Sequence, residues 1–221
     1  MPIDPNRETW KPGMGWEQAV DDMGYIRGLA QELGGPERIK RQHSGGRYTV
    51  RERIDKMVDP GSFMEAGPLV GAVEYDEDGN LQSVLPAPFL FGKAQINGRP
   101  VVATADDFTI RGGAADAGIS RKMVQAEKMA HELKLPIIRM IDGTGGGGSV
   151  KTLEQIGATY IPAVPGWSDV VKNLDTVPVV ALALGPTAGL GAARTVASHY
   201  SIMVKGLSQL FAAGPAVVDG L

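Results

Sequence analysis

Three segments of this sequence share one pattern, in which an apolar stretch runs into a glycine-rich loop and then into a helical stretch. The loops are residues 106–118 (DDFTIRGGAADAG), 142–149 (DGTGGGGS) and 184–194 (LGPTAGLGAAR). Strands that alternate with helices favour β-α-β units around a mostly parallel sheet. The pattern therefore predicts an α/β fold whose loops gather at the carboxyl ends of the strands, where open α/β sheets bind ligands.

The periodicity of the apolar residues places the individual elements. Strands predominate after residue 62, with a turn region at Asp78-Gly79-Asn80. Asn97-Gly98 predicts a tight hairpin, because both residues tolerate positive φ. We expect strands at residues 69–75, 89–96, 99–107, 135–142, 177–185 and 200–206, and helices at residues 114–134, 149–160, 168–174 and 189–198.

The first 60 residues are more charged than the rest and predict helices. Helical spacing of apolar residues indicates a first helix that ends at Gly34-Gly35. A later helix is predicted at residues 49–58, because Thr49 and Glu52 form a T-x-x-E capping box. We therefore expect a helical arm, residues 1–60, followed by one larger domain, residues 61–221.

Residues 38–56 of this arm are strongly basic, with seven Lys or Arg residues against two acidic residues. One interpretation is a solvated helix face whose charges form internal ion pairs. The other interpretation is an arm that faces the phosphates of a ligand. The sequence alone leaves both interpretations open.

Composition narrows the class of protein. The chain has 221 residues, a net charge of −3 and no cysteine. The charge gives no reason to expect binding to nucleic acid or to an anionic membrane. The absence of cysteine excludes disulfides and thiolate zinc sites and agrees with a reducing compartment, and no metal site is predicted. The N-terminal residues lack the apolar core of a signal peptide, so we expect a cytoplasmic protein, or a mitochondrial matrix protein if the source is eukaryotic.

The second loop most needs an explanation, because five of the six residues from Gly143 to Gly148 are glycine. Tight turns alone would account for one or two of them. Gly143, Gly145 and Gly148 also match the G-x-G-x-x-G spacing of dinucleotide-binding loops. That hypothesis needs an acidic residue at the tip of the next strand, and Asp169 has the spacing but follows a proline-rich segment. A P-loop is excluded, because no Gly-Lys-Ser/Thr follows.

Backbone N–H groups that hold a developing oxyanion explain the glycines better. Such donors stabilise an enolate oxygen without a side chain, and losing one typically costs roughly 3–4 kcal/mol. No acidic or basic side chain lies between Gly143 and Val150 or between Gly189 and Ala193. A hydratase or an isomerase would need such a group within hydrogen-bond reach. We therefore expect the base to belong to a cofactor or to the substrate.

Taken together, these stretches resemble a known family. The chain is similar to the carboxyltransferase (beta) subunit of biotin-dependent acyl-CoA carboxylases, the group of propionyl-, acetyl- and methylcrotonyl-CoA carboxylases in the crotonase superfamily. The similar stretches keep the family's order over residues 36–221: RQHSGGRYTVRERIDKMVDPGSFMEAG, DDFTIRGGAADAG, LPIIRMIDGTGGGG, VPVVALALGPTAGLGAA and YSIMVKGLSQLFAAGPAVV. The resemblance implies an α/β crotonase-like β-β-α spiral with an N-terminal helical arm. It covers the N-terminal half of the family's subunit, so we expect a fragment or one half of a split enzyme.

The resemblance also implies an activity. In this family a carboxyl group moves from N1 of carboxybiotin to the α-carbon of an acyl-CoA thioester, and the ureido group of biotin takes the α-proton. Backbone amides hold the thioester and ureido oxygens. The implied partners are a biotin carboxylase, a biotin carboxyl carrier subunit, and further copies of the chain, commonly as a hexamer.

The roles of individual residues follow only from their positions in the family's motifs. Gly145 and Gly146 match the first oxyanion loop, and Gly189 and Leu190 match the loop that presents amides in crotonase-type enzymes. The residues implied to bind substrate are Gly112 and Gly113 in the F-T-x-x-G-G loop, Thr144 and Gly147 in the second loop, and Arg41 and Arg47 in the basic arm. Gly147 departs from the family, which has an arginine there.

Two alternatives use the same features. A decarboxylase, or another crotonase-type acyl-CoA enzyme, would also need an oxyanion hole beside a thioester. A fragment that binds coenzyme A without activity would keep the loops and lack the rest of the active site.

Overall fold

The computed structural model describes residues 3–4, 7–113, 117–143 and 166–212, and among these the side chains of residues 117–120 are not described. Most of the strands form one sheet in the order β1-β4-β5-β6-β7-β8, and β9 also pairs with β7. The strands are β1 (Met64–Glu65), β4 (Phe89–Ile96), β5 (Arg99–Asp106), β6 (Ile137–Gly143), β7 (Val179–Ala188), β8 (Tyr200–Met203) and β9 (Gln209–Phe211). The pairings from β5 to β9 are parallel, whereas β1–β4 and β4–β5 are antiparallel. The predicted, mostly parallel sheet is confirmed.

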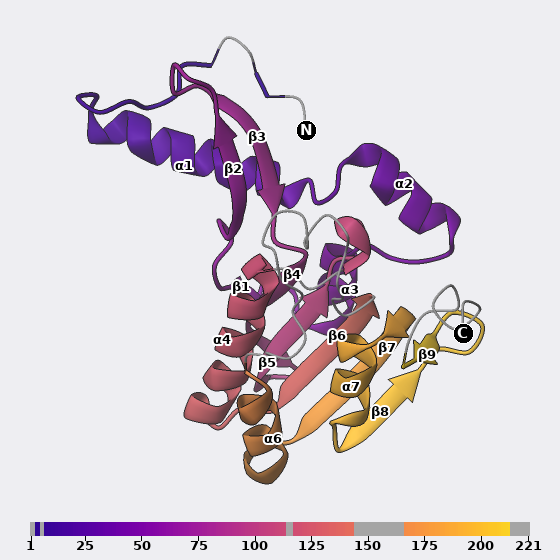
Figure 1. Cartoon of the computed structure of the whole chain (residues 1–221). Helices are drawn as coiled ribbons and strands as arrows, with labels where there is room; N and C mark the ends of the chain where they lie inside the picture. Colours follow the sequence, from indigo (N-terminus) through magenta and orange to yellow (C-terminus); the bar gives the residue numbers. More distant parts are fainter. Residues whose placement is uncertain (1–2, 5–6, 114–116, 144–165, 213–221) are drawn as a thin grey trace.

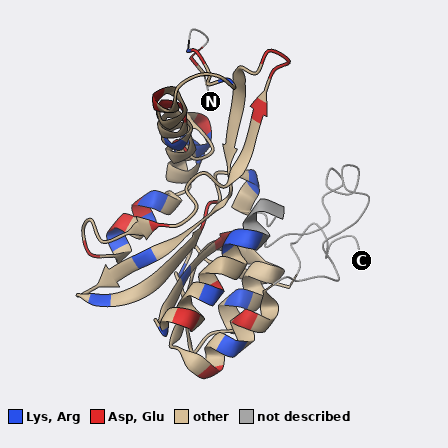
Figure 2. Cartoon of the chain, turned by 90° about the vertical axis from the view of Figure 1, so that its left-hand side faces the viewer, with Lys and Arg blue, Asp and Glu red and all other residues tan. Residues whose placement is uncertain are grey.

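Helices cover both faces of this sheet (Figure 1). The helices of the arm are α1 (Trp16–Gln31), α2 (Pro36–Ser44) and α3 (Val50–Met57), and the later ones are the short η1 (Arg111–Gly113), α4 (Ala117–Leu133), α6 (Trp167–Thr176) and α7 (Leu190–Val196). Successive side chains of a strand point to opposite faces. Val102, Ile137 and Val179 therefore pack with α4, while Ala103, Met140 and Leu182 pack with α3. Figure 2 shows the charged residues mainly on the helices, with the strands largely free of them.

The capping box predicts the start of α3 correctly. Thr49 Oγ1 accepts from the Glu52 N–H at 3.3 Å, and Glu52 Oε2 accepts from the Thr49 N–H at 2.7 Å. The Asn97-Gly98 hairpin is also confirmed, with φ of 51° and 75° between the paired Ile96 and Arg99. Two sequence signals that depend only on local backbone chemistry were thus sufficient for these features.

Three strands were missed in the sequence, and one of them, β1, has only two residues. β3 (Leu81–Pro86) pairs with β2 (Gly71–Tyr75) in a separate two-stranded sheet. Polar residues and a terminal proline weaken the strand pattern of β3, and the three-residue β9 is too short to show a period. The helix expected at residues 149–160 lies outside the described residues.

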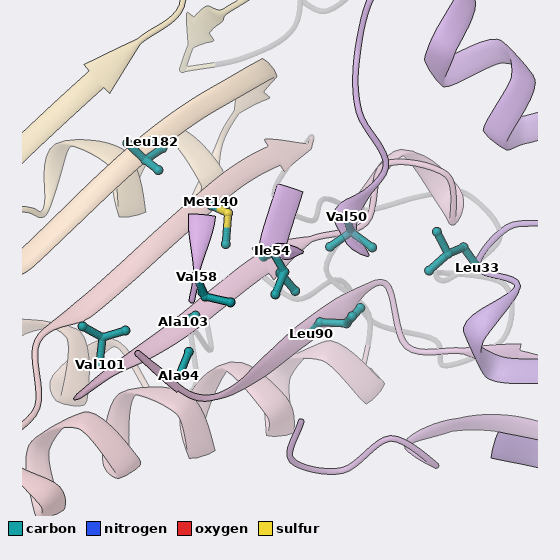
Figure 3. Close-up of a cluster of buried hydrophobic side chains, with 11 residues drawn as sticks. Leu33, Val50, Ile54, Val58, Leu90, Ala94, Val101, Ala103, Met140 and Leu182 are labelled. Atoms are coloured by element: carbon teal, nitrogen blue, oxygen red, sulfur yellow. The ribbon is translucent and has the colours of Figure 1, made fainter. Parts of the chain in front are cut away.

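The arm contributes to two clusters of buried side chains. Leu29 of α1 packs with Leu81 and Val84 of β3, above the main sheet in Figure 1. Val50 and Ile54 of α3 instead belong to the largest core cluster, against β4 to β7 (Figure 3). The boundary at residue 60 stays a prediction, but in its packing α3 belongs with the sheet. None of the described helices is both long enough and apolar enough to cross a membrane.

The role of α3 in the core is testable with Ile54→Ala. The Ile54 side chain is 1% exposed, so its truncation removes buried apolar surface and leaves a cavity. We expect the free energy of unfolding to fall by about 2–5 kcal/mol in chemical denaturation. Val20→Ala on α1, where the side chain is 66% exposed, is the control and should change stability by less than about 0.5 kcal/mol. Equal losses from the two variants would show that α3 does not pack in the core.

Candidate functional site

The three glycine loops meet backbone to backbone at the carboxyl ends of β5, β6 and β7. A Cβ atom on Gly113 would lie 2.5 Å from the carbonyl oxygen of Asp142, and a Cβ atom on Gly143 would lie 2.9 Å from the carbonyl oxygen of Gly113. A Cβ atom on Gly191 would lie 3.1 Å from the carbonyl oxygen of Gly143. Side chains at Gly113 or Gly143 would force these loops apart, so the convergence depends on bare backbone. The prediction that the loops gather in one place is confirmed for their described parts.

Several predicted residues cannot be placed. Thr144, Gly145, Gly146 and Gly147 lie outside the described residues, and their roles stay predictions. Gly112 and Gly113 form the end of η1 with φ of 66° and 67°, a backbone conformation that favours glycine. The Gly113 N–H donates to the carbonyl of Ile110 at 3.0 Å.

Gly189 and Leu190 differ in what their amides do. Gly189 is the residue before α7, and its N–H donates to the carbonyl of Phe211 on β9 at 3.1 Å. Its N–H is therefore already paired. Leu190 begins α7, where an N–H has no acceptor within the helix, and no acceptor for it occurs among the described residues. Of this predicted pair, Leu190 is therefore the residue whose N–H can donate a hydrogen bond to a ligand oxygen.

The fully buried carboxylate of Asp142, at the end of β6, binds three side chains of the arm. Arg53 Nη2 donates to its Oδ2 at 2.6 Å, and Gln42 Nε2 donates to the same oxygen at 3.2 Å. Arg47 Nη1 lies 3.6 Å from its Oδ1. Burial raises the pKa of Asp142, while the charge of Arg53 and its hydrogen bond act in the opposite direction. These contacts fix α2 and α3 to the start of the second glycine loop.

A second buried carboxylate links the strand ends to α7. Asp106 Oδ1 accepts from Arg194 Nη1 at 3.1 Å, and Asp106 Oδ2 accepts from the Asp142 N–H at 3.3 Å. At the C-terminal end of α7, the fully buried Arg139 donates to the carbonyls of Arg194 and Ala197, and it also donates to both carboxylate oxygens of Glu127 on α4. The position of α7, and with it that of Leu190, is set by these two arginines.

A cavity of about 200 Å³ lies beside the first loop and carries four arginines. Its lining residues are Arg38, Arg41, Gln42, Arg47, Phe108, Thr109, Arg111 and Gly112. Arg47 lies over the Phe108 ring, 4.5 Å from its centroid, so the cation has a fixed place at the wall. No carboxylate is among the lining residues. The cavity thus brings together Arg41, Arg47 and Gly112, which the sequence predicted separately.

The structure changes the interpretation of the basic arm. Arg53 is buried, Arg47 and Arg51 are half-buried, and Arg51 Nη1 binds Glu65 Oε2 at 3.0 Å. A solvated face is therefore wrong for these residues, although Lys40, Arg41 and Lys56 are exposed. No signal in the sequence indicated Gln42, Phe108 or the pairing of Asp142 with Arg53, because a local pattern does not indicate contacts between residues far apart in the chain.

The described carboxylates near the loops are all buried. Asp106 and Asp142 are buried and bind arginines. Asp107 is also fully buried, and its Oδ1 accepts from the N–H and the hydroxyl of Thr109 at 2.9 and 2.6 Å. Burial raises the pKa of Asp107, and the bonds from Thr109 oppose this. Asp106 and Asp107 thereby hold backbone N–H groups at the loops, those of Asp142 and Thr109.

Comparison with known families identifies the domain. A model of the carboxyl transferase domain matches residues 41–221. The chain belongs to the carboxyl transferase domain family. One relative is the human mitochondrial propionyl-CoA carboxylase beta chain, which is 30% identical to this chain. The match covers 85% of this chain and 34% of the human protein. The Veillonella parvula methylmalonyl-CoA decarboxylase subunit alpha is 30% identical over 85% of the chain and 36% of its own length.

A solved structure of transcarboxylase 12S has the same fold as this carboxyl transferase domain. It superposes with a TM-score of 0.74 at 28% identity, over 95% of this chain and 40% of that one. That protein is described as a hexamer with methylmalonyl-coenzyme A and methylmalonic acid bound. The crotonase-like α/β fold predicted from the sequence is confirmed. The chain spans between 34% and 40% of the length of these three proteins.

Asp169 does not have the position that a dinucleotide-binding site requires. Asp169 lies in the first turn of α6, not at a strand tip, and pairs with Lys172 on the same helix at 3.7 Å. The other two glycines of that motif, Gly145 and Gly148, lie outside the described residues. The position of Asp169 therefore gives no support to a Rossmann-type dinucleotide site in this domain.

The contact between the arm and the second loop predicts a coupled loss of stability. Arg53→Met leaves the buried Asp142 carboxylate without its strongest partner, and we expect it to cost about 3–5 kcal/mol of unfolding free energy. In the Asp142→Asn background the same change should cost much less, because the buried charge is gone. Chemical denaturation of the four proteins measures the coupling, with exposed Lys56→Met on the same helix as the control. An equal cost of Arg53→Met in both backgrounds would exclude the ion pair as the cause.

Proposed function

We propose that this chain supplies the acyl-CoA side of a biotin-dependent carboxyltransferase active site. In that reaction a carboxyl group moves from carboxybiotin to the α-carbon of an acyl-CoA thioester. The observation that carries the proposal is the meeting of three glycine loops beside a cavity lined by arginines. The family match and the relatives that act on acyl-CoA thioesters support it.

The arginine cavity is suited to the phosphates of coenzyme A. Arg38 and Arg41 extend from α2, Arg47 lies between α2 and α3, and Arg111 lies in the first loop. Arginine binds phosphate oxygens through charge-assisted hydrogen bonds, which are stronger than neutral ones. Because Gly112 also lines this cavity, a ligand held there would lead directly to the first glycine loop.

The backbone at the loops is suited to the thioester end. Leu190 offers an N–H at the start of α7, and Gly145 and Gly146 are proposed as the donors of the second loop. Gly113 and Gly143 allow the loops to approach each other without side chains. Donors fixed by the packed loops would stabilise an enolate oxygen without reorganising during the reaction.

The described carboxylates at the loop ends are buried and bind arginines or Thr109, which supports a reaction whose base is not a protein side chain. Carboxybiotin, when bound, would supply the carboxyl group and, after its transfer, a basic ureido group. The residues of this chain would bind the thioester, orient its α-carbon and hold its oxygen. The proposal includes a biotin carboxylase and a biotin carboxyl carrier as partners, a homo-oligomer such as a hexamer, and a cytoplasmic or mitochondrial matrix location.

Decarboxylation of an acyl-CoA is the second candidate, favoured by the similarity to a methylmalonyl-CoA decarboxylase subunit. An oxyanion hole would stabilise the same enolate in both reactions. Release of CO2 from methylmalonyl-CoA in the absence of biotin would favour the decarboxylase. Binding of coenzyme A without either reaction, even with biotin present, would favour an inactive binding fragment.

The arginine cavity gives the sharpest test. Arg41→Gln removes one cationic lining residue, and we expect the dissociation constant of propionyl-CoA to rise about tenfold or more, because a charge-assisted hydrogen bond contributes about 1.5–3 kcal/mol. Isothermal titration calorimetry measures this. Dephospho-coenzyme A, which lacks one phosphate, shows whether Arg41 meets that phosphate.

Lys40→Gln is the matched control, because Lys40 is an exposed cation on the same helix and does not line the cavity. It should leave the affinity within about twofold of the unchanged chain. Equal weakening by both variants would point to general electrostatic attraction, and no weakening by Arg41→Gln would remove the cavity from the proposed site.

A further inference from the structure

A second and larger cavity of about 490 Å³ lies between α4, β4 and the segment that follows β1. Its volume falls in the range of small-molecule sites, roughly 300–1,000 Å³. The lining residues are Ala66, Gly67, Val70, Phe91, Arg121, Lys122, Gln125, Met129, Glu132 and Leu133. None of them lines the arginine cavity or belongs to the described parts of the glycine loops. This cavity is therefore distinct from the proposed carboxyltransferase site.

The walls of this cavity are largely apolar. Phe91 on β4 is 4% exposed and packs in a cluster with Ala66 and Met129 around it. Leu133, near the end of α4, is 49% exposed, which leaves apolar surface open to solvent at this cavity. The polar lining residues Arg121, Gln125 and Glu132 are exposed on α4. Such a cavity would gain from an apolar chain that covers the phenylalanine and methionine side chains.

Lys122 is the exception among the lining residues, because its charged side chain is only 4% exposed. Its Nζ lies 3.8 Å from Glu65 Oε1, longer than a hydrogen bond, and the other oxygen of Glu65 accepts from Arg51 Nη1 at 3.0 Å. Within the described part of the chain, Lys122 has no hydrogen-bond acceptor. Burying an ammonium group without full pairing is costly.

The electrostatic surroundings of Lys122 also favour an additional anion beside its ammonium group. Burial lowers the pKa of Lys122 to about 8, Glu65 acts to raise it, and Arg51 lowers it further. Lys122 also lines a small neighbouring cavity with Arg51, Glu65 and the buried Asp107. Glu65 is thus shared between two cations. A further carboxylate near Lys122 would complete the pairing that Glu65 alone does not provide.

We propose that the cavity between α4 and β4 binds a small carboxylate with an unbranched apolar chain, of the fatty-acid type. The carboxylate would pair with the ammonium group of Lys122, and the chain would lie against Phe91 and Met129. The apolar walls exclude a polyanion such as a nucleotide as the preferred ligand, because its phosphates would lose water without enough cations to replace it. This site does not depend on the proposed carboxyltransferase activity.

Calorimetric titration of the unchanged chain with octanoate, octan-1-ol and octylamine tests the chemical class. We expect octanoate to bind about tenfold or more tightly than octan-1-ol, and octylamine to bind weakest, because the cation of Lys122 repels it. Saturating coenzyme A should not displace octanoate. Equal affinities for the acid and the alcohol, or no measurable binding of octanoate, would overturn the proposal.

Two variants locate the site. Lys122→Met keeps an apolar side chain of similar length and should reduce octanoate affinity to that of octan-1-ol. Gln125→Trp adds bulk at an exposed lining position and should block binding of both compounds without disturbing the core. Lys128→Met is the matched control, because Lys128 is an exposed cation on the same helix outside the cavity. Octanoate binding that survives Lys122→Met or Gln125→Trp, or that falls equally with Lys128→Met, would overturn the proposal.

Discussion

The buried carboxylate of Asp142 is the interaction on which the rest of the candidate site depends. It stands at the end of β6, where the second glycine loop begins, and binds Arg53 and Gln42 of the arm. Its backbone N–H is held in turn by Asp106, which binds Arg194 of α7. One carboxylate pair therefore fixes the distances between the arm, two strand ends and the helix that follows the third loop. Buried charges of this kind need full pairing, so each partner limits where the others can lie.

The same ties explain why the arm and the glycine loops form one site. Arg47 lies 3.6 Å from Asp142 and also lines the cavity that holds Arg41 and Gly112. Arg47 therefore helps to hold the arm against the sheet and also offers a cation to a ligand in the cavity. The glycine loops and the arginine cavity lie side by side, because Gly112 of the first loop lines the cavity. This arrangement suits a ligand with a reactive carbonyl at one end and phosphates at the other.

The chain has two cationic cavities of different character. The four arginines beside the first loop line a cavity that has no carboxylate among its lining residues, which is typical of a site for a polyanion. Lys122 lines the other cavity alongside apolar walls and shares Glu65 with Arg51. Of the two cations that line this cavity, Arg121 is exposed and only Lys122 is buried. One buried cation with apolar neighbours favours a single carboxylate. The two cavities differ in the number of cations and in the polarity of their walls. These differences, more than the cavity volumes, favour a polyanion in one cavity and a single carboxylate in the other.

The sequence by itself determined the features whose cause is local. The capping box at Thr49, the positive φ of Asn97-Gly98 and the alternation of strands with glycine loops and helices were all predicted, because each depends on neighbouring residues. The short β9 and the polar β3 were missed, because pairing with β7 and β2 makes them strands. The solvated interpretation of the basic arm is wrong for Arg53 for the same reason, since this residue binds a carboxylate 89 residues away. Only the tertiary structure decided which cations are buried and which carboxylates bind them, because those contacts form between segments that the sheet brings together. It also decided that Gly189 has an acceptor for its N–H whereas Leu190 has none among the described residues.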